Sequence, residues 1–204
     1  MPALDLPAGS YTVLKGPSGS GKTTLLNLMA GIMVPTEGTI WLDGTDIVAL
    51  PEARRDRFRA AHIGYIFQTF NLMTSLTALE NVLLATMFAP KLSKRDQRQR
   101  AAATLSTLGL DERLSYRPHH LSRGEQQRVA IARALVNDPP IILADEPCAS
   151  LDPQTAQVVL AELLSICRRE RKTVLIVSHD ERALRGADRV LDMTAINRAG
   201  APAP

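Results

Sequence analysis

The sequence predicts an α/β fold, with a core built on a parallel sheet and a helical segment inserted into it. Short apolar runs such as Tyr11–Lys15, Ile141–Asp145 and Thr173–Val177 alternate with stretches of helical periodicity, which is typical of parallel strands joined by helices. One long stretch in the middle of the chain carries only helical patterns. A length of 204 residues fits one domain. We expect this domain to span 1–204, with a core at about 1–70 and 138–204 and a helical subdomain at about 71–137.

Each expected element carries its own signal. Thr77 followed by Glu80 is a capping box that opens a helix. Pro139-Pro140 ends the helical stretch, and Pro153 begins a later helix. We expect strands at Tyr11–Lys15, Thr39–Leu42, Ile63–Phe67, Ile141–Asp145, Thr173–Val177 and Arg189–Met193. We expect helices at Leu25–Ala30 (closed by Gly31), Pro51–Ala61, from Thr77 onward, at Asp96–Leu108, Ser122–Val136, Pro153 to about Arg169, and Glu181–Ala187.

The charge and cysteine patterns exclude several classes of protein. The chain has 24 Lys and Arg against 21 Asp and Glu, and acidic residues interrupt each basic run, as on solvated helix faces. Aromatic residues make up 4% of the chain, too few for base-stacking platforms, so we expect no nucleic-acid partner. Cys148 and Cys167 lack metal-ligand spacing and indicate free thiols in a reducing compartment. The longest apolar runs are too short to cross a membrane, which favours a cytoplasmic protein.

The first strong motif is a phosphate-binding loop. The strand Tyr11–Lys15 runs into a glycine-rich turn and then a helix, the context that this motif requires. Glycines let backbone N–H groups turn inward around phosphate oxygens, and the helix N-terminus adds a partial positive charge. Lys22 is placed to reach the β- and γ-phosphates, and the Thr23 hydroxyl to bind Mg²⁺. The candidate phosphate-binding residues are Gly16, Pro17, Ser18, Gly19, Ser20, Gly21, Lys22, Thr23 and Thr24.

An acid pair follows the apolar strand Ile141–Ala144. Asp145 at the end of the strand is placed to hold Mg²⁺ through water, and Glu146 can act as a general base on the attacking water. Ligands of open parallel sheets gather at the carboxyl ends of the strands, where both residues would lie. The pair therefore predicts a site that hydrolyses a bound nucleotide.

A second helix start lies between these two motifs. Ser122 and Glu125 form a capping-box pattern, and Gly124 lies between them. This helix N-terminus is a second potential phosphate contact. One nucleotide does not need two such termini from one chain, but two chains that face each other would each supply one.

Together these motifs resemble the nucleotide-binding subunit of an ABC transporter, and the resemblance covers nearly the whole chain. Six motifs occur in the family's order, and this order is highly specific. They are the Walker A loop at Gly16–Thr24, the Q-loop glutamine Gln68, the signature at Leu121–Glu125, the Walker B strand at Ile141–Glu146, the D-loop at Ser150–Asp152 and the switch histidine His179. Residues Ile63–Val82 are most similar to the lipoprotein-release, macrolide-export and cell-division branch.

The resemblance implies a P-loop, RecA-like ATPase that works as a head-to-tail dimer with ATP between one copy's Walker A loop and the other's signature helix. It implies ATP and Mg²⁺ as ligands, with Thr23, Gln68 and Asp145 near the metal. It implies that Glu146, Gln68 and His179 act in hydrolysis. It places Ser122, Gly124, Glu125 and Asp152 at the ATP. It also implies a membrane permease as partner, on the cytoplasmic face of the inner membrane.

Three features depart from the family pattern. Only fifteen residues precede Gly16, so we expect the family's N-terminal antiparallel strands and their adenine-stacking aromatic to be truncated; Tyr11 lies on the core strand and does not replace it. Arg123 replaces the first glycine of the signature, where it would either clash or offer a guanidinium to the partner's phosphates. Cys148 stands where threonine is common, a neutral change.

The sequence leaves the biological role open. The leading hypothesis is an ATPase that powers a transporter or export complex through dimer closure and opening. The alternatives are an ATP-dependent regulatory module bridging a membrane partner, as in cell division, and a truncated, weakened ATPase. Phe70, Leu72 and Met73 are either permease contacts or ordinary core. In the family that the chain resembles, the membrane subunit selects the substrate, so this sequence does not indicate what is transported or in which direction.

Overall fold

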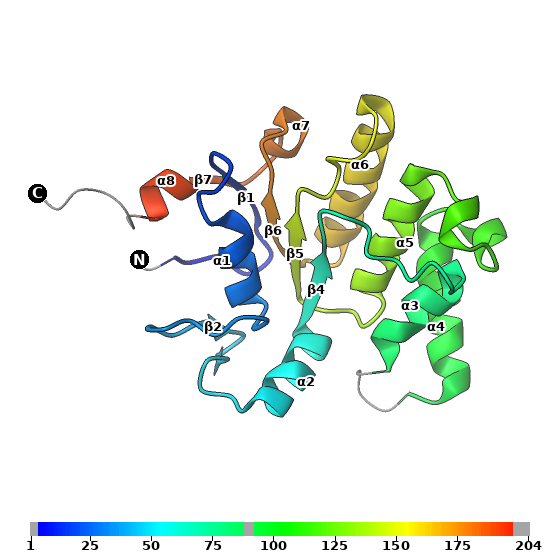
Figure 1. Ribbon diagram of the computed structural model, residues 1–204, viewed down its shortest axis with the longest axis horizontal. Coiled ribbons are helices and arrows are strands. Elements are labelled where there is room, and N and C mark those ends of the chain that lie inside the picture. Colours follow the sequence, from blue (N-terminus) through cyan, green and yellow to red (C-terminus); the bar gives the residue numbers. More distant parts are fainter. Residues whose placement is uncertain (1–3, 88–91, 198–204) are drawn as a thin grey trace, which may run out of the picture.

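The computed structural model describes residues 4–87 and 92–197. Five strands form a sheet in the order β4-β5-β6-β1-β7, and each neighbouring pair is parallel (Figure 1). The predicted α/β fold with a parallel core is therefore confirmed. The strands are β1 (Tyr11–Lys15), β4 (Ile63–Ile66), β5 (Ile141–Asp145), β6 (Thr173–Val177) and β7 (Arg189–Asp192).

Apolar side chains cover both faces of this sheet, because successive residues of a strand point to opposite sides. On β1, Val13 belongs to one buried cluster and Leu14 to another. The first cluster joins the sheet to helices α3 (Ala78–Thr86), α4 (Lys94–Thr107), α5 (Arg123–Leu135) and α6 (Pro153–Arg169). The second joins it to α1 (Lys22–Met29) and α8 (Met193–Ile196). In Figure 1 the helical segment and α6 accordingly lie on one side of the strands and α1 on the other.

All helices except the last follow the predicted pattern, with shifts of at most three residues at their ends, and the last helix, α8 (Met193–Ile196), was not predicted. Contacts between α3, α4 and α5 hold the helical segment together, and α5 also packs on β4 and α6. The helices are α1 (Lys22–Met29), α2 (Glu52–His62), α3 (Ala78–Thr86), α4 (Lys94–Thr107), α5 (Arg123–Leu135), α6 (Pro153–Arg169), α7 (Glu181–Leu184) and α8 (Met193–Ile196).

Two local features differ from the sequence-based prediction. The strand expected at Thr39–Leu42 is reduced to β2 (Trp41–Leu42), which pairs with β3 (Thr45–Asp46) in a separate antiparallel hairpin. The strand expected to end at Met193 ends at Asp192, whose side chain accepts a hydrogen bond from the Thr194 N–H and caps α8. Among the described residues, β1 is the first strand in the chain.

The strand register brings distant segments to one edge of the sheet. Val177 of β6 pairs with both Leu14 of β1 and Asp145 of β5, and Ile66 of β4 pairs with Ala144. All four strands therefore end at the same edge, and the segments that follow them begin there. These segments are the glycine-rich loop, the acid pair, the Gln68 segment and the His179 loop.

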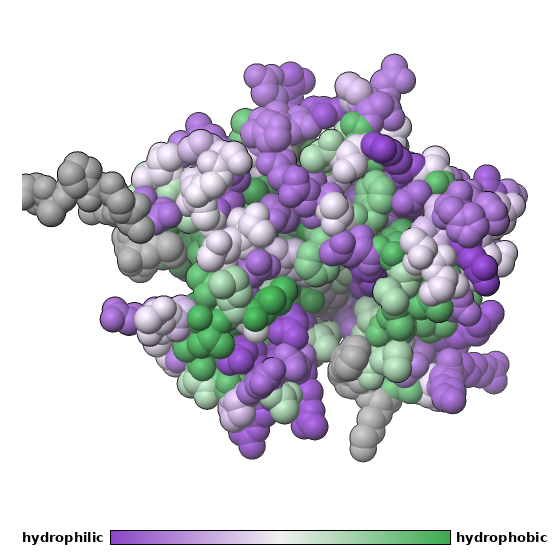
Figure 2. Space-filling view, viewed as in Figure 1, coloured by the Kyte–Doolittle hydropathy of each residue, from purple (hydrophilic) through white to green (hydrophobic). Residues whose placement is uncertain are grey.

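One exposed apolar patch lies away from this edge. Figure 2 shows apolar side chains gathered near the end of α1 and β2, where Ile32, Met33, Val34 and Trp41 are exposed. In the described part of the chain, no helix is both long and apolar enough to cross a lipid bilayer.

Candidate nucleotide site

The glycine-rich loop connects β1 to α1. Gly16 has a φ of 155°, and an added Cβ would lie 2.9 Å from the Met193 Cβ atom, so a larger residue would displace α8 or the loop. Gly21 caps α1 in the left-handed conformation, with a φ of 97°. The Lys22 ammonium folds back over the loop and donates hydrogen bonds of 2.8 Å to the carbonyls of Gly16 and Pro17. The loop therefore holds its own cation at the place where phosphates are expected.

A short hydrogen bond joins the loop helix to the neighbouring strand β5. The Thr23 hydroxyl, in the first turn of α1, donates to Asp145 Oδ2 at 2.7 Å. Asp145 is buried, with 5% of its surface exposed. A hydroxyl and a carboxylate oxygen are the ligands that Mg²⁺ prefers. Among the described residues no group of three His, Cys, Asp or Glu side chains gathers, so a metal here would take its remaining ligands from phosphates and water.

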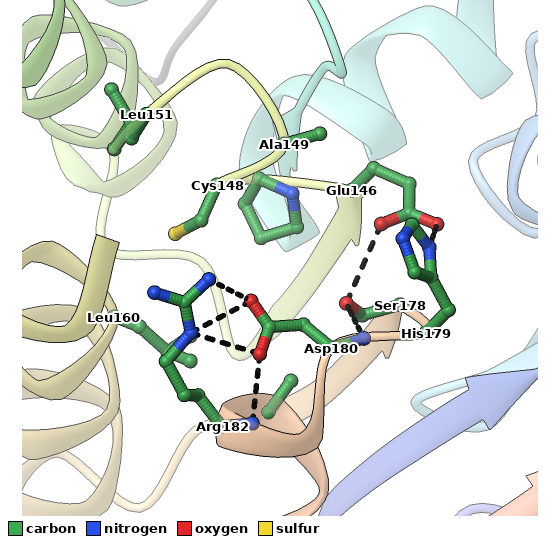
Figure 3. A pocket seen from close by; sticks show the side chains of 11 residues that line it. Glu146, Cys148, Ala149, Leu151, Leu160, Ser178, His179, Asp180 and Arg182 are labelled. Carbon is green, nitrogen blue, oxygen red and sulfur yellow. Dashed lines mark hydrogen bonds and ion pairs between the residues drawn. The ribbon is translucent and has the colours of Figure 1, made fainter. Parts of the chain in front are cut away.

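The next residue, Glu146, faces the loop that follows β6. Its carboxylate is 2.8 Å from the Nδ1 atom of His179 and accepts a 3.4 Å hydrogen bond from the Ser178 hydroxyl (Figure 3). Glu146 has a φ of 45°, in a region that glutamate rarely occupies. The His179 side chain is 80% exposed and that of Glu146 is 15% exposed, so the pair lies at the surface with the histidine outermost.

Gln68 follows β4 at the same edge of the sheet but stays apart from the acid pair. It is exposed, and among the described residues no hydrogen bond joins it to Asp145 or Glu146. Arg133 of α5 instead holds the backbone just beyond it, with hydrogen bonds to the carbonyls of Phe70 at 2.9 Å and Asn71 at 2.5 Å. The signature helix thus fixes the segment after Gln68.

The predicted capping box at the start of α5 is confirmed. The Ser122 hydroxyl accepts a hydrogen bond from the Glu125 N–H, and the Glu125 carboxylate accepts one from the Ser122 N–H at 2.8 Å. Gly124 lies tight against α6, because an added Cβ would come within 2.6 Å of the Thr155 methyl group. Arg123 does not clash within the chain; its guanidinium points along the surface and donates to the Ser150 carbonyl at 3.2 Å.

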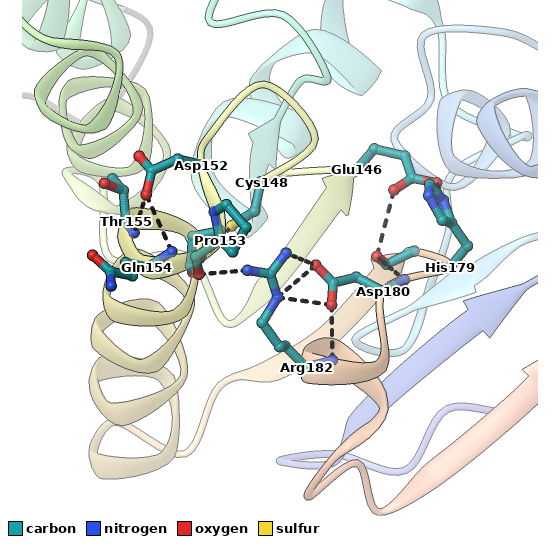
Figure 4. Close-up of polar contacts among 11 residues, drawn as sticks. Glu146, Cys148, Asp152, Pro153, Gln154, Thr155, His179, Asp180 and Arg182 are labelled. Carbon is teal, nitrogen blue, oxygen red and sulfur yellow. Dashed lines mark hydrogen bonds and ion pairs between the residues drawn. The ribbon is translucent and has the colours of Figure 1, made fainter.

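Asp152 lies at the start of α6 and is exposed (Figure 4). Its carboxylate accepts hydrogen bonds from the N–H groups of Gln154 and Thr155, and the pKa of this carboxyl is lowered, mainly by Thr155. In the described structure no hydrogen bond connects Ser122, Gly124 or Asp152 with the glycine-rich loop or with Glu146. One chain therefore presents these residues separately from its own loop and acid pair.

Of two further residues named in the sequence analysis, Tyr11 lies in the core and Cys148 packs against it. Tyr11 is buried, and its hydroxyl donates to the Ala183 carbonyl, as expected for a core strand residue. Cys148 is partly buried beside the Glu146 segment, and burial raises the pKa of its thiol to about 12. Such a thiol is a poor nucleophile at neutral pH.

Sequence reasoning missed three residues that shape the site. Ser178 bonds to Glu146, Arg133 holds the segment after Gln68, and Arg182 bonds to the residue after His179. Ser178 could have been noticed because it directly precedes His179. The two arginines carry no such signal, since a helical arginine is ordinary on a solvated face and only the folded chain shows which carbonyl it reaches.

A parallel sheet with a glycine-rich loop after one strand and an acid pair after another places the chain among the P-loop nucleoside triphosphatases. Comparisons with known proteins give the family. Residues 2–149 match the family model described as "ABC transporter". The chain is 45% identical over 188 residues to the uncharacterized ABC transporter ATP-binding protein YvrO of Bacillus subtilis, covering 92% of this chain and 81% of that protein.

Two further comparisons agree. The chain is 42% identical to the lipoprotein-releasing system ATP-binding protein LolD of Pseudomonas fluorescens, covering 93% of this chain and 83% of LolD. The dimeric structure of a post-hydrolysis state of the ATP-binding cassette MJ0796 bound to ADP and Pi matches with a TM-score of 0.84 and 40% identity, over 93% of this chain and 83% of that one. The chain belongs to the ABC transporter family and is an ATPase domain of that family. Some relatives are longer: the chain spans 57% of a Mycobacterium tuberculosis ATP-binding protein.

Proposed function

We propose that this chain is the ATP-hydrolysing subunit that powers an export-type ABC transporter. The observation that carries the proposal is the meeting of the Lys22 loop, the Thr23–Asp145 contact and the Glu146–His179 pair at one edge of the sheet. A phosphate on the loop would face both the metal ligands and the base. The similarity to LolD supports the export-type role.

Within one copy, the residues divide the work of phosphoryl transfer. The backbone N–H groups of residues 16–24 and the Lys22 ammonium bind the phosphates, which requires Lys22 to exchange its two loop carbonyls for phosphate oxygens. Thr23 and Asp145 would hold Mg²⁺, which would neutralise phosphate charge. Glu146 accepts the proton of the attacking water, and His179 contacts the γ-phosphate. Gln68, which follows β4 at the same edge of the sheet, would contact Mg²⁺ or the attacking water.

A second copy completes the site. Ser122 and Asp152 begin helices at the surface, and in the described structure they form no hydrogen bond with the loop of their own chain. We infer that the partner copy's Ser122, Gly124, Glu125 and Asp152 meet the ATP held by the first copy, as a head-to-tail pair requires. The dimeric state of the MJ0796 cassette supports this arrangement. Hydrolysis removes the γ-phosphate between the copies, and they separate.

The permease partner would contact the segment that follows Gln68, on the cytoplasmic face of the membrane. Met73 is 54% exposed there, whereas Leu72 packs on the core. Asn81, fully buried, fixes the turn with hydrogen bonds to the backbone of Met73, Leu76 and Thr77. A rigid turn that displays a flexible apolar side chain suits a protein contact. Of the three candidate contact residues, Met73 is therefore the one we propose.

The test is the substitution Glu146→Gln, which keeps the shape of the side chain and removes the base. Phosphate release should fall roughly 100- to 10,000-fold, the usual contribution of a general base. Binding of a fluorescent ATP analogue should persist, because the phosphate loop is intact. Glu181→Gln is the matched control, since Glu181 is 85% exposed and lies outside the site. Turnover by Glu146→Gln at the parent's rate would overturn the assigned base.

A further inference from the structure

Arg182 links two segments that the sequence treats as separate motifs. It lies on α7, just beyond His179, and its side chain is half-buried. Its Nε atom donates to both carboxylate oxygens of Asp180 at 2.9 Å, and another guanidinium nitrogen also bonds to that carboxylate (Figure 4). Its remaining nitrogen donates to the Pro153 carbonyl at 2.5 Å. One side chain thus holds the His179 loop and the first residue of α6 together.

Each end of this link leads to a residue of the proposed site. On one side, the Asp180 N–H donates to the Ser178 hydroxyl at 3.0 Å, and that hydroxyl donates to Glu146. On the other side, Pro153 directly follows Asp152, the exposed cap of α6. A continuous series of hydrogen bonds and one peptide bond therefore runs from the acid pair to the surface residue that a second copy would meet.

The space between the two segments is only partly filled by side chains. A pocket of about 220 Å³ lies there, and Arg182 lines it together with residues that include Leu151 and Leu160 (Figure 3). Apolar packing of Leu160 and Ala183 joins the two segments on the inner side of the pocket, and the polar link of Arg182 joins them as well. A planar guanidinium suits this task, because it binds a carboxylate with two nitrogens and still presents a third.

We propose that Arg182 is a positioning residue, which couples the Asp152 end of α6 to the His179 loop so that engagement of a second copy sets the Glu146–His179 pair. This inference rests on the proposed function. Arg182 is not assigned a phosphate contact, because its guanidinium is occupied by Asp180 and the Pro153 carbonyl. It lowers the pKa of the Asp180 carboxyl, which keeps that partner ionised at neutral pH.

The experiment compares Arg182→Gln with Arg182→Lys and with the control Arg185→Gln. Arg185 directly follows the same short helix, is 81% exposed and forms a weak ion pair with Glu181 at 3.9 Å. For Arg182→Gln we expect kcat for ATP hydrolysis to fall about tenfold with KM within twofold, because a misplaced catalytic pair loses rate rather than binding. Arg182→Lys should recover part of the rate, and Arg185→Gln should equal the parent.

A double substitution separates coupling from simple structural damage. Asp152→Asn keeps a capping side chain on α6 and removes the charge. If Arg182 transmits the state of Asp152, the double variant should be no slower than the slower single variant. If the rate losses of Arg182→Gln and Asp152→Asn multiply in the double variant, the inference is overturned. It is also overturned if the parent is active and Arg182→Gln hydrolyses ATP as fast as Arg185→Gln. A parent without ATP hydrolysis would overturn the proposed function itself.

Discussion

Two helices of this chain, α3 and α5, begin with the same capping motif, but the backbone N–H groups at their N-termini have different partners. At the start of α3, Thr77 and Glu80 form a reciprocal capping box, and at the start of α5, Ser122 and Glu125 form another. In both, a hydroxyl accepts from the third residue and a glutamate accepts from the cap. The two boxes stabilise their helices in the same way.

The difference lies in the next two N–H groups of each helix. At α3, the Ala78 N–H donates to the Tyr116 carbonyl at 2.7 Å and the Leu79 N–H to the Leu114 carbonyl at 3.0 Å. At α5, neither the Arg123 nor the Gly124 N–H donates to any residue in 4–87 or 92–197. Unpaired N–H groups at a helix start attract anions. The capping box is therefore a folding signal in both helices, whereas the open N–H groups mark α5 as the one suited to an outside acceptor.

The largest effect should come from placing a carboxylate at each cap. Aspartate caps a helix as well as serine or threonine, so Ser122→Asp and Thr77→Asp should both fold with the parent's melting temperature. Ser122→Asp should lower ATP hydrolysis roughly 100-fold, since a negative charge replaces a donor facing phosphate. Thr77→Asp should keep the parent's rate. Equal rates in the two variants would remove the functional distinction between the helices.

Mixing two inactive variants tests whether Ser122 at the start of α5 contacts the ATP that is bound by the other copy. Lys22→Ala and Ser122→Asp each damage both sites of a dimer, but a mixed dimer keeps one intact site. Random pairing at equal amounts should restore about a quarter of the parent's rate. Phosphate release measured over a series of mixing ratios tests this, and a mixture as inactive as its components would argue that Ser122 acts within its own chain.

The smallest effect concerns stability. Ser122→Ala and Thr77→Ala each remove a capping hydroxyl, and each should lower the free energy of unfolding by about 1 kcal/mol. Urea denaturation of both variants measures whether the two capping boxes contribute equally to the free energy of unfolding. A much larger loss for Thr77→Ala would show that the contacts with Tyr116 and Leu114 depend on that cap.

The sequence predicted the five strands of the parallel sheet, the order of helices α1 to α7 and both capping boxes, because these depend on local periodicity and on short motifs. Strands β1, β5 and β6 have the predicted bounds. Helix α8 was missed because its four residues give no periodic signal, and the cap at Asp192 is recognisable only once β7 ends there.

In the candidate site, too, some residues could be predicted from the sequence and others could not. Motif spacing identified Lys22, Asp145 and Glu146, and the parallel register brings their segments to one edge. The bonds of Arg133 and Arg182 join residues 63 and 29 positions apart. Contacts over such separations depend on tertiary packing, so they could not be predicted from one sequence.

The left-handed backbone conformation at Glu146 creates a conflict between catalytic activity and thermodynamic stability at one position. A non-glycine residue in that conformation costs on the order of 1–3 kcal/mol, and glycine or asparagine would tolerate it better. Selection for thermal stability alone should therefore favour replacements of Glu146. Such variants would have a higher melting temperature and would lack the proposed catalytic base.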